Sequence, residues 1–268
     1  MIRILRETAF TLLNVLQALF LAVWSMGWMG SAVIVRLLTG SPEKALAMAR
    51  WGYSRPIIRA ATARLVVDPL PEVDWKQPHV YVMNHQSMLD IVCAFAALPV
   101  NLRFVCKHSL SSVPFLGWYI WATQMVPVNR TNRVQAVASL SQAAERVRRG
   151  ANIIAFPEGK RSREGEILPF KKGPFMLALE AGVPLIPIAI HGSGAVLPSD
   201  GFRLRPGTIR VRVGQPIPTA GRAADRDALI REARAAVVQM NLDMGGPGGV
   251  AQDIASERPD EPVPGRAA

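Results

Sequence analysis

A histidine and an aspartate five residues apart are the first candidates for chemistry in this sequence. His85 and Asp90 lie in VYVMNHQSMLD, where the histidine closely follows the apolar run 79–83. Residues five apart on a regular helix point about 140° apart, so the two cannot share one helical face. If His85 precedes the helix and the loop turns back, the Asp90 carboxylate can accept a hydrogen bond from the imidazole, which leaves the other ring nitrogen as a general base. The alternative is structural, with Ser87 as an N-cap and Asp90 as its capping-box acid.

Cationic side chains gather behind two further apolar runs. The stretch FPEGKRSREGEILPFKKG (156–173) begins as the run 152–156 ends and places Lys and Arg around a Pro-Glu-Gly turn, and Arg130 follows the run 124–128. Arginine offers forked donors to phosphate, and lysine offers a point charge. Ligands of open α/β sheets bind at the carboxyl ends of the strands. We therefore expect one site for a phosphorylated substrate beside the base His85; a solvated basic loop is the alternative.

The apolar runs that must position these side chains alternate with helical stretches. This alternation is typical of an α/β fold, with a mostly parallel sheet flanked by helices on both faces. The segment 208–213 has period two and is predicted to be an edge or late strand, and 223–243 is predicted to be a last amphipathic helix. The other predicted strands are 79–83, 103–106, 124–128, 152–156 and 184–190, and the other predicted helices are 87–97, about 109–122, 132–149 and 173–182.

The N-terminal region has no charged residue from Thr8 to Val35. One helix of that length would span about 42 Å, against roughly 30 Å for the hydrocarbon core of a bilayer. The sequence predicts a membrane anchor, either one tilted span or two helices broken near 27–31. A signal peptide fits less well, because its apolar part runs about 7–15 residues. A buried soluble helix also fits less well, because Trp24 and Trp28 resemble an interfacial anchor.

The charge balance favours anionic partners. The net charge is +11 and the mean hydropathy is +0.19, which suits a phospholipid surface, a phosphorylated substrate or nucleic acid. The basic region 36–64 is either an amphipathic helix on anionic lipid or an ordinary solvated helix, and by the positive-inside rule it is cytoplasmic. Cys93 and Cys106 lack zinc-ligand spacing and indicate core residues in a reducing compartment. From residue 245 the composition predicts disorder.

Four ordered motifs resemble those of the membrane glycerophospholipid acyltransferases, specifically the 1-acyl-sn-glycerol-3-phosphate acyltransferases. Two positions depart from the usual pattern: Asn129 stands where an acidic residue is usual, and Lys160 stands where threonine is usual. The resemblance covers about residues 40–220. The matching residues are Asn84, His85 and Asp90 for the first motif, Arg130 for the second, FPEGKRS (156–162) for the third, and Pro187 in VPLIPIAI for the fourth.

The resemblance implies an α/β fold like that of glycerol-3-phosphate acyltransferase, with a mostly parallel sheet, preceded by an N-terminal membrane-embedded helical segment. It implies an anchoring segment 1–64, a catalytic domain 65–244 and a disordered tail 245–268. The implied location is the inner membrane, with the catalytic domain on the cytoplasmic side. The implied partners are the membrane phospholipid surface, lysophosphatidic acid and acyl-CoA or acyl-carrier protein as co-substrate, without nucleic acid.

The resemblance also implies a mechanism. His85 would take the proton of the sn-2 hydroxyl of a lysophospholipid, and the oxygen would attack the thioester to give phosphatidic acid. Asp90 would orient the imidazole, and no metal or redox cofactor is implied. The residues that would hold the phosphate and glycerol are Arg130, Glu158, Gly159, Arg161 and Ser162, with Lys107 and Lys171 as further candidates.

Two rival functions stay open on the sequence alone. The first is acyl transfer to another lyso-lipid acceptor such as lyso-ornithine lipid, because Lys160 and Asn129 depart from the usual motifs. The second is a membrane-tethered protein that binds anionic lipid or nucleic acid without chemistry; salt-sensitive binding without thioester consumption would favour it. A serine or cysteine hydrolase is disfavoured, because the sequence lacks Gly-x-Ser-x-Gly and neither cysteine lies in a nucleophile motif.

Overall fold

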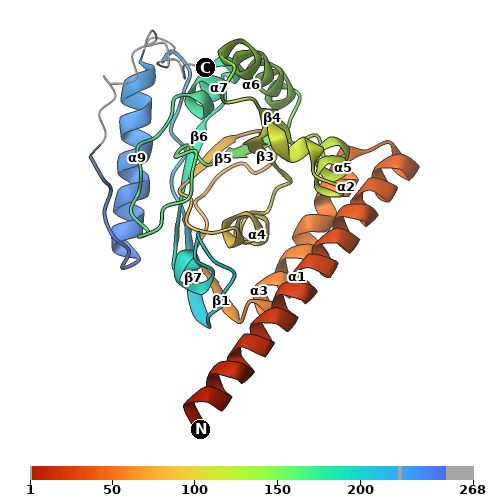
Figure 1. Cartoon of the computed structure of the whole chain (residues 1–268). Coiled ribbons are helices and arrows are strands. Elements are labelled where there is room, and N and C mark those ends of the chain that lie inside the picture. The colour runs from red at the N-terminus through yellow and green to blue at the C-terminus, as the bar shows by residue number, and fades with distance from the viewer. Residues whose placement is uncertain (1, 223–224, 252–268) are drawn as a thin grey trace, which may run out of the picture.

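Parallel strand pairing organises the chain, as the alternation of runs predicts (Figure 1). The computed structural model describes residues 2–222 and 225–251, and the sheet within them has seven strands in the order β1-β7-β6-β2-β5-β3-β4. The five strands from β6 to β4 run parallel to one another. Their bounds are β2 Val80–Met83, β3 Leu102–Lys107, β4 Val126–Val128, β5 Asn152–Ala155 and β6 Leu185–His191.

Two strands of opposite direction complete the sheet. β7 (Gly207–Val213) pairs antiparallel with β6, and β1 (Ala63–Val67) pairs parallel with β7. The segment 208–213 is therefore a late strand but not an edge, because β1 covers its free side. Sequence reasoning missed β1, which has no alternating pattern and is only half-buried. The period-two pattern of β7 reflects the burial of Ile209 and Val211 beneath the helices.

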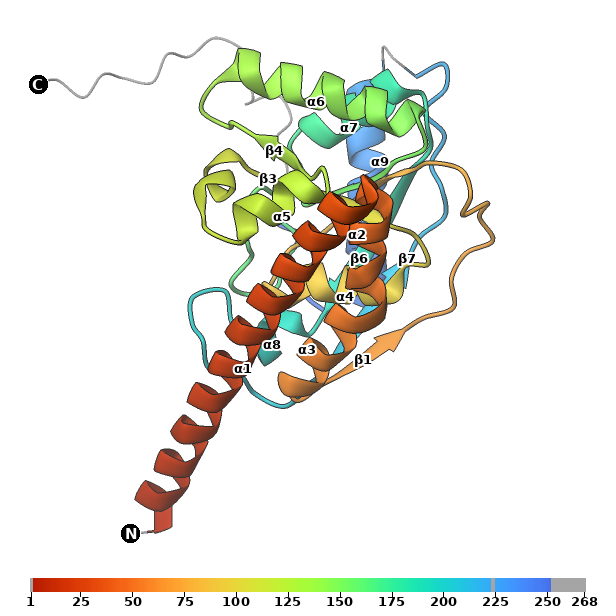
Figure 2. The same cartoon turned by 90° about the vertical axis from the view of Figure 1, so that its right-hand side faces the viewer.

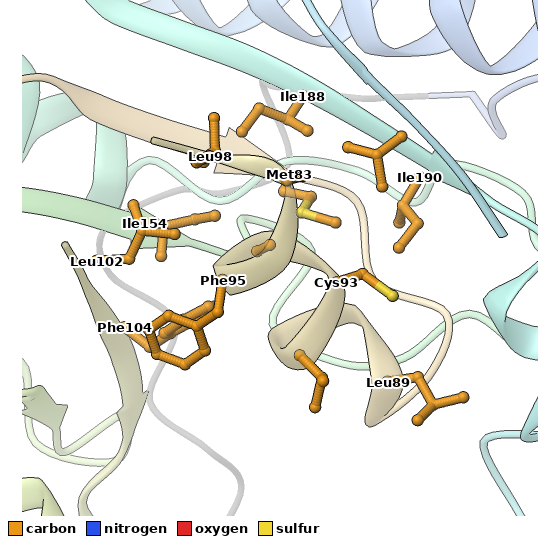
Figure 3. Close-up of a cluster of buried hydrophobic side chains, with 14 of the residues drawn as sticks. Met83, Leu89, Cys93, Phe95, Leu98, Leu102, Phe104, Ile154, Ile188 and Ile190 are labelled. Atoms are coloured by element: carbon orange, nitrogen blue, oxygen red, sulfur yellow. The ribbon is translucent and has the colours of Figure 1, made fainter. Parts of the chain in front are cut away.

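Strand side chains alternate between two hydrophobic clusters, one on each face of the sheet. Tyr81 and Met83 of β2 belong to the first cluster, and Val80 and Val82 belong to the second. Figure 3 shows part of the first cluster, where Met83 lies among side chains of α4 and the neighbouring strands. Each fully buried side chain of this size stabilises the fold by about 1.5–3 kcal/mol.

Helices cover both faces (Figures 1 and 2). The first face carries α2, α3, α4 and α5, and the second carries α6, α7 and α9. The bounds on the first face are α2 Pro42–Met48, α3 Ser54–Ala60, α4 Leu89–Ala97 and α5 Leu116–Ala122. Those on the second face are α6 Arg133–Arg148, α7 Gly173–Ala181 and α9 Arg226–Asp243, and the short helix α8 spans Ser193–Val196. Residues 223–224 of the predicted last helix lie outside the described residues.

The N-terminal apolar region forms one long helix, α1 (Ile2–Thr39), and not two helices broken near 27–31. Within the described residues it is the one helix long and apolar enough to cross a membrane, with a mean hydropathy of 1.8. Large apolar side chains line its outer face and are exposed, which indicates membrane association. They include Leu12, Leu16, Leu19, Val23, Ile34 and Leu38.

The inner face of α1 lies along the α/β core. Gln17 Nε2 donates to the backbone oxygen of Ala60 at 2.8 Å, and the Arg36 guanidinium lies 5.7 Å from the Trp121 ring centroid. The chain then returns beneath α1 through α2, a π-helical turn (Ala49–Tyr53) and α3. This returning segment packs buried side chains into the first cluster, so it does not lie on the surface as an isolated amphipathic helix.

Residues 245–250 lie against the core. The Val250 N–H donates to the Ile167 oxygen at 3.1 Å, and Arg234 Nη2 donates to the same oxygen at 2.9 Å. The expectation of disorder from residue 245 therefore does not hold for this stretch, because backbone pairing and an arginine hold it. Residues 252–268 of the predicted tail lie outside the described residues.

Candidate active site

His85 and Asp90 are in direct contact. His85 lies in the loop between β2 and α4, and its Nδ1 is 2.7 Å from Asp90 Oδ2. The loop turns back on the first turn of α4, which brings together two side chains that one helix would point apart. Asp90 is fully buried, whereas the His85 side chain is 13% exposed. The imidazole therefore has the buried Asp90 carboxylate at its Nδ1, while part of the ring remains accessible to solvent.

The bonds of Asp90 assign the protons of this pair. Its Oδ2 also accepts from the backbone N–H groups of Gln86 at 2.7 Å and of Ser87 at 2.8 Å. An oxygen that accepts from two backbone donors is an acceptor toward the imidazole too, so Nδ1 donates and Nε2 is left with a free lone pair. The predicted capping box is not formed, because α4 begins one residue later, with Met88 as N-cap, and the Ser87 hydroxyl accepts from Leu89 N–H at 3.2 Å. Asp90 still binds the backbone before α4 and contacts His85.

An aromatic stack supports the imidazole. The His85 ring lies 3.9 Å from the Phe156 ring, centroid to centroid, with 12° between the planes. Phe156 in turn stacks with Phe104 at 5.8 Å. Sequence reasoning missed this role of Phe156. The available signal was that Phe156 ends the run 152–156, whose strand β5 pairs directly with β2.

The loop after β5 is bound to the backbone of His85. Glu158 Oε1 accepts from His85 N–H at 2.7 Å, and Oε2 accepts from Leu168 N–H at 3.1 Å. The Ser162 N–H donates to the His85 oxygen at 2.7 Å. Burial raises the pKa of Glu158 to about 8, although both backbone bonds act in the opposite direction. Because both carboxylate oxygens are occupied, Glu158 acts on the site by positioning the histidine.

Asn84 and Pro187 join the histidine loop to β6. The Asn84 side chain donates to the Ile190 oxygen at 2.9 Å and accepts from Ile190 N–H at 2.8 Å. Pro187 lies in β6 opposite Val82 of β2. These residues of the first and fourth motifs therefore hold the strand end from which His85 projects.

Two predicted phosphate-binding residues converge on Gly159. Arg130 Nη1 donates to the Gly159 oxygen, and the Lys171 side chain lies so close that a Cβ at position 159 would be 3.3 Å from its Nζ. Gly159 has φ +72, in the region that favours glycine. Lys107 ends β3 and pairs in register with Val128, two residues before Arg130. The structure thus places these cations at the edge of the sheet formed by the carboxyl ends of β3, β4 and β5.

A polar cavity of about 730 Å³ opens beside this edge. It contains the predicted Arg161 and Ser162 together with Lys160 and Arg163, so its three cationic side chains come from the start of the loop. Carboxylates of Glu164, Glu166 and Asp200 line it as well. The cavity can therefore bind an anionic group and also offers acceptors for hydroxyl or amino groups.

An apolar cavity of about 370 Å³ lies between α1, α4, α5 and β3. Met88 and Leu89 line it just beyond the His85 loop, and Phe104 of the aromatic stack forms part of its wall. Its remaining wall is almost wholly aliphatic and aromatic, with residues such as Trp28, Ala45, Phe95, Leu116 and Ile120. Such a cavity suits a hydrocarbon chain.

The chain is similar in sequence to known acyltransferases. The family model described as acyltransferase matches residues 64–191. The chain is 37% identical over 179 residues to the chloroplastic 1-acyl-sn-glycerol-3-phosphate acyltransferase BAT2 of Brassica napus, covering 66% of this chain and 50% of that one. It is 35% identical over 175 residues to the chloroplastic enzyme LPAT1 of Arabidopsis thaliana, covering 65% and 47%. The chain thus spans about half the length of the curated relatives it matches.

A solved structure has the same fold. The crystal structure of the 1-acyl-sn-glycerophosphate acyltransferase PlsC from Thermotoga maritima matches with a TM-score of 0.77 and 24% identity, over 91% of this chain and all of that one. The likeness covers the α/β sheet and extends over most of the molecule. Over residues 64–191 the chain is similar to the acyltransferase family model, and over about two thirds of its own length it is similar to the two chloroplastic relatives at 35–37% identity.

Proposed function

We propose that this protein transfers a fatty acyl group from acyl-CoA or acyl-carrier protein to the sn-2 hydroxyl of 1-acyl-sn-glycerol-3-phosphate. The observation that carries the proposal is the 2.7 Å contact between His85 Nδ1 and the buried Asp90 carboxylate. Neighbours of this pair line both cavities, Ser162 the polar one and Met88 the apolar one. The names of the relatives from Brassica napus and Arabidopsis thaliana support the same reaction.

His85 acts as the general base in this proposal. Its Nε2 takes the proton of the acceptor hydroxyl as the oxygen bonds to the thioester carbonyl carbon. The carbon–sulfur bond then breaks, and the departing thiolate receives a proton from the imidazolium. Asp90 stabilises that cation and holds the ring, within the roughly 10²–10⁴-fold contribution of general acid–base catalysis. A thioester is already activated, so the reaction needs no acyl-enzyme.

The two cavities divide the substrates between them. Arg130, Arg161 and Lys171, with Lys107 at the adjacent strand end, bind the phosphate of the acceptor near Gly159. Glu158 and Ser162 shape the loop through their bonds to the His85 backbone. A fatty acyl chain occupies the apolar cavity, whose wall includes Phe104 next to the aromatic stack.

The protein works at the inner membrane with its catalytic residues on the cytoplasmic side. The exposed apolar face of α1 supports attachment to lipid. Exposed Arg55 and Arg59 on the returning helix α3 support the cytoplasmic side, where anionic headgroups attract cations.

A second acceptor class has one observation in its favour. Glu164, Glu166 and Asp200 line the polar cavity together with the cations. Carboxylates repel a phosphate and attract an amino group, so the cavity also suits a zwitterionic acceptor such as lyso-ornithine lipid. The non-catalytic alternative explains neither the His85–Asp90 contact nor the free edge of the ring.

The test is an acyl-transfer assay on the full chain in detergent. It is run with lysophosphatidic acid, lyso-ornithine lipid and lysophosphatidylcholine, each with acyl-CoA, and it measures release of the free CoA thiol. We expect release with lysophosphatidic acid and none from the His85→Ala chain. Release only with lyso-ornithine lipid would assign the second acceptor class. No release with any acceptor, from either acyl-CoA or acyl-carrier protein, would overturn the proposal.

A further inference from the structure

Helix α5 is presented on a tightly folded turn. The predicted helix 109–122 is broken at Pro114 and Phe115, and Phe115 has φ +62, which is rare for a bulky residue. The turn also needs Gly117, because a Cβ there would lie 2.1 Å from the Ser111 oxygen. Backbone strain of this kind persists only when the surroundings fix it. The segment before α5 is therefore held in one conformation, and this fixes the direction of its side chains.

Three aromatic side chains project from this turn into solvent. Phe115, Trp118 and Trp121 are spaced by three residues, so they form one stripe along α5, which we call the aromatic stripe. Trp118 is 55% and Trp121 is 56% exposed. The Phe115 and Trp118 rings also pack edge to face, with centroids 5.1 Å apart. Large aromatic rings on a solvent-exposed surface are unfavourable in water and mark an interaction surface.

The inner side of the same helix is already occupied. Leu116, Tyr119 and Ile120 of α5 line the apolar cavity. The helix is therefore apolar all round, which is typical of a helix whose two sides both lie against apolar surroundings. The core supplies those surroundings on one side only.

The aromatic stripe continues the exposed face of α1. The Arg36 guanidinium of α1 lies 5.7 Å from the Trp121 ring centroid, and Figure 2 shows α5 beside the C-terminal half of α1 on the face toward the viewer. Ile34 and Leu38 of α1 are exposed near this contact in the sequence. Lys107 is also exposed, just before the turn.

We propose that the aromatic stripe inserts into the interface of an anionic phospholipid membrane and forms a second lipid contact beside α1. Tryptophan is enriched at the headgroup level because its ring is apolar and its N–H is polar. The cation Arg36 then meets lipid phosphates. Continuity with the apolar face of α1 favours lipid over a protein partner. The contact places the apolar cavity within the width of one helix from the bilayer.

The experiment measures the depth of single fluorescent labels on the full chain. A cysteine is introduced by Trp118→Cys or, on a second chain, Trp121→Cys, and is labelled with an environment-sensitive dye. The matched control is Val134→Cys on α6, which is 79% exposed and lies on the other face of the sheet. Native Cys93 is buried and Cys106 is half-buried, so the unsubstituted chain gives the background. The vesicles contain phosphatidylcholine and phosphatidylglycerol, and flotation confirms that every chain is bound.

On vesicles, we expect the emission of the labels at 118 and 121 to shift to shorter wavelength and to be quenched by nitroxide lipids. We also expect the efficiency of iodide quenching at both positions to fall several-fold. The control label at 134 keeps its iodide quenching. Equal iodide access at 118, 121 and 134 on floated chains overturns the proposal. The second labelled position covers the case in which one substitution prevents folding. Vesicles are prepared with fewer than one chain each on average. A shift that appears only when several chains share a vesicle assigns the stripe to a second copy and also overturns it.

Discussion

Glu158 Oε1 accepts a hydrogen bond from the backbone N–H of His85 at 2.7 Å, while Oε2 accepts from Leu168 N–H at 3.1 Å. The Glu158 carboxyl group bridges the histidine loop and the far end of its own loop. Replacement by alanine leaves the His85 and Leu168 N–H groups without this acceptor. We expect Glu158→Ala to lower the free energy of unfolding by about 1–3 kcal/mol and to reduce turnover through a displaced His85. Thermal denaturation in detergent and the acyl-transfer assay check both effects, and Glu72→Ala at an exposed position is the matched control.

The same carboxyl predicts a pH dependence of stability. Burial raises the pKa of Glu158 from 4.5 to about 8, so the folded protein holds this proton more tightly than the unfolded chain. The contribution is fully present below about pH 4.5 and is lost as the pH rises through about 8. We expect the melting temperature to fall as the pH rises across this interval in the wild type, and to fall less in Glu158→Gln. Parallel curves for the two chains would show that Glu158 does not titrate there.

The proposed base gives the sharpest kinetic prediction. His85→Ala is expected to lower turnover roughly 10²–10⁴-fold, the usual contribution of a general base, with folding and vesicle flotation unchanged. Asp90→Asn is expected to cost less, because His85 remains and the asparagine oxygen can still accept from Gln86 and Ser87. The loss then reflects a less well oriented ring and a less stabilised imidazolium. Turnover like that of the wild type in His85→Ala would end the general-base hypothesis.

Substitutions of the arginines should distinguish substrate binding from the chemical step. The phosphate that Arg161 binds does not change charge during acyl transfer, so Arg161→Ala should raise KM for lysophosphatidic acid more than it lowers kcat. Loss of a bond to a charged group corresponds to about 1.5–3 kcal/mol, or roughly 10–100-fold in KM. Arg161→Lys should rescue only in part, because a point charge lacks bidentate geometry.

Arg130 should behave differently, because it also donates to the Gly159 oxygen. Arg130→Ala is expected to raise KM and to lower kcat as well, since it releases the loop that holds His85. Kinetics at fixed acyl-CoA separate the two effects, with Lys44→Ala on α2 as the control. A fall in kcat at constant KM for Arg161→Ala would mean that this arginine serves the transition state instead.

Deletion of residues 1–38 tests the role of α1. The inner face of this helix includes Trp24, which packs against the first hydrophobic cluster, and Trp28, which lines the apolar cavity. Its removal exposes both surfaces, so we expect loss of vesicle flotation and aggregation in size-exclusion chromatography. A monodisperse truncated protein with full activity on membrane substrate would show that α1 is dispensable.

Local patterns in the sequence determined most of the elements and pointed to the proposed catalytic pair. Five apolar runs became the five parallel strands, and His85 follows one of them, so its place at the carboxyl end of the sheet was predictable. The His85–Asp90 contact was one of two interpretations that the sequence left open, beside helix capping by Asp90, and the structure has it because the loop turns back. The interior position of 208–213 in the sheet was not predictable, because pairing with Ala63–Val67 joins segments more than a hundred residues apart.

Tertiary structure alone decided which groups surround the pair. Phe156 against the His85 ring, Glu158 on its backbone N–H, and Arg130 on the Gly159 oxygen are long-range contacts. The strand order and the register of the sheet determine these contacts, and hydrophobic periodicity predicts neither. The apolar cavity has the same origin, because its wall joins α1, α4, α5 and β3. The sequence specifies which side chains are apolar, but the space between them depends on how distant elements pack.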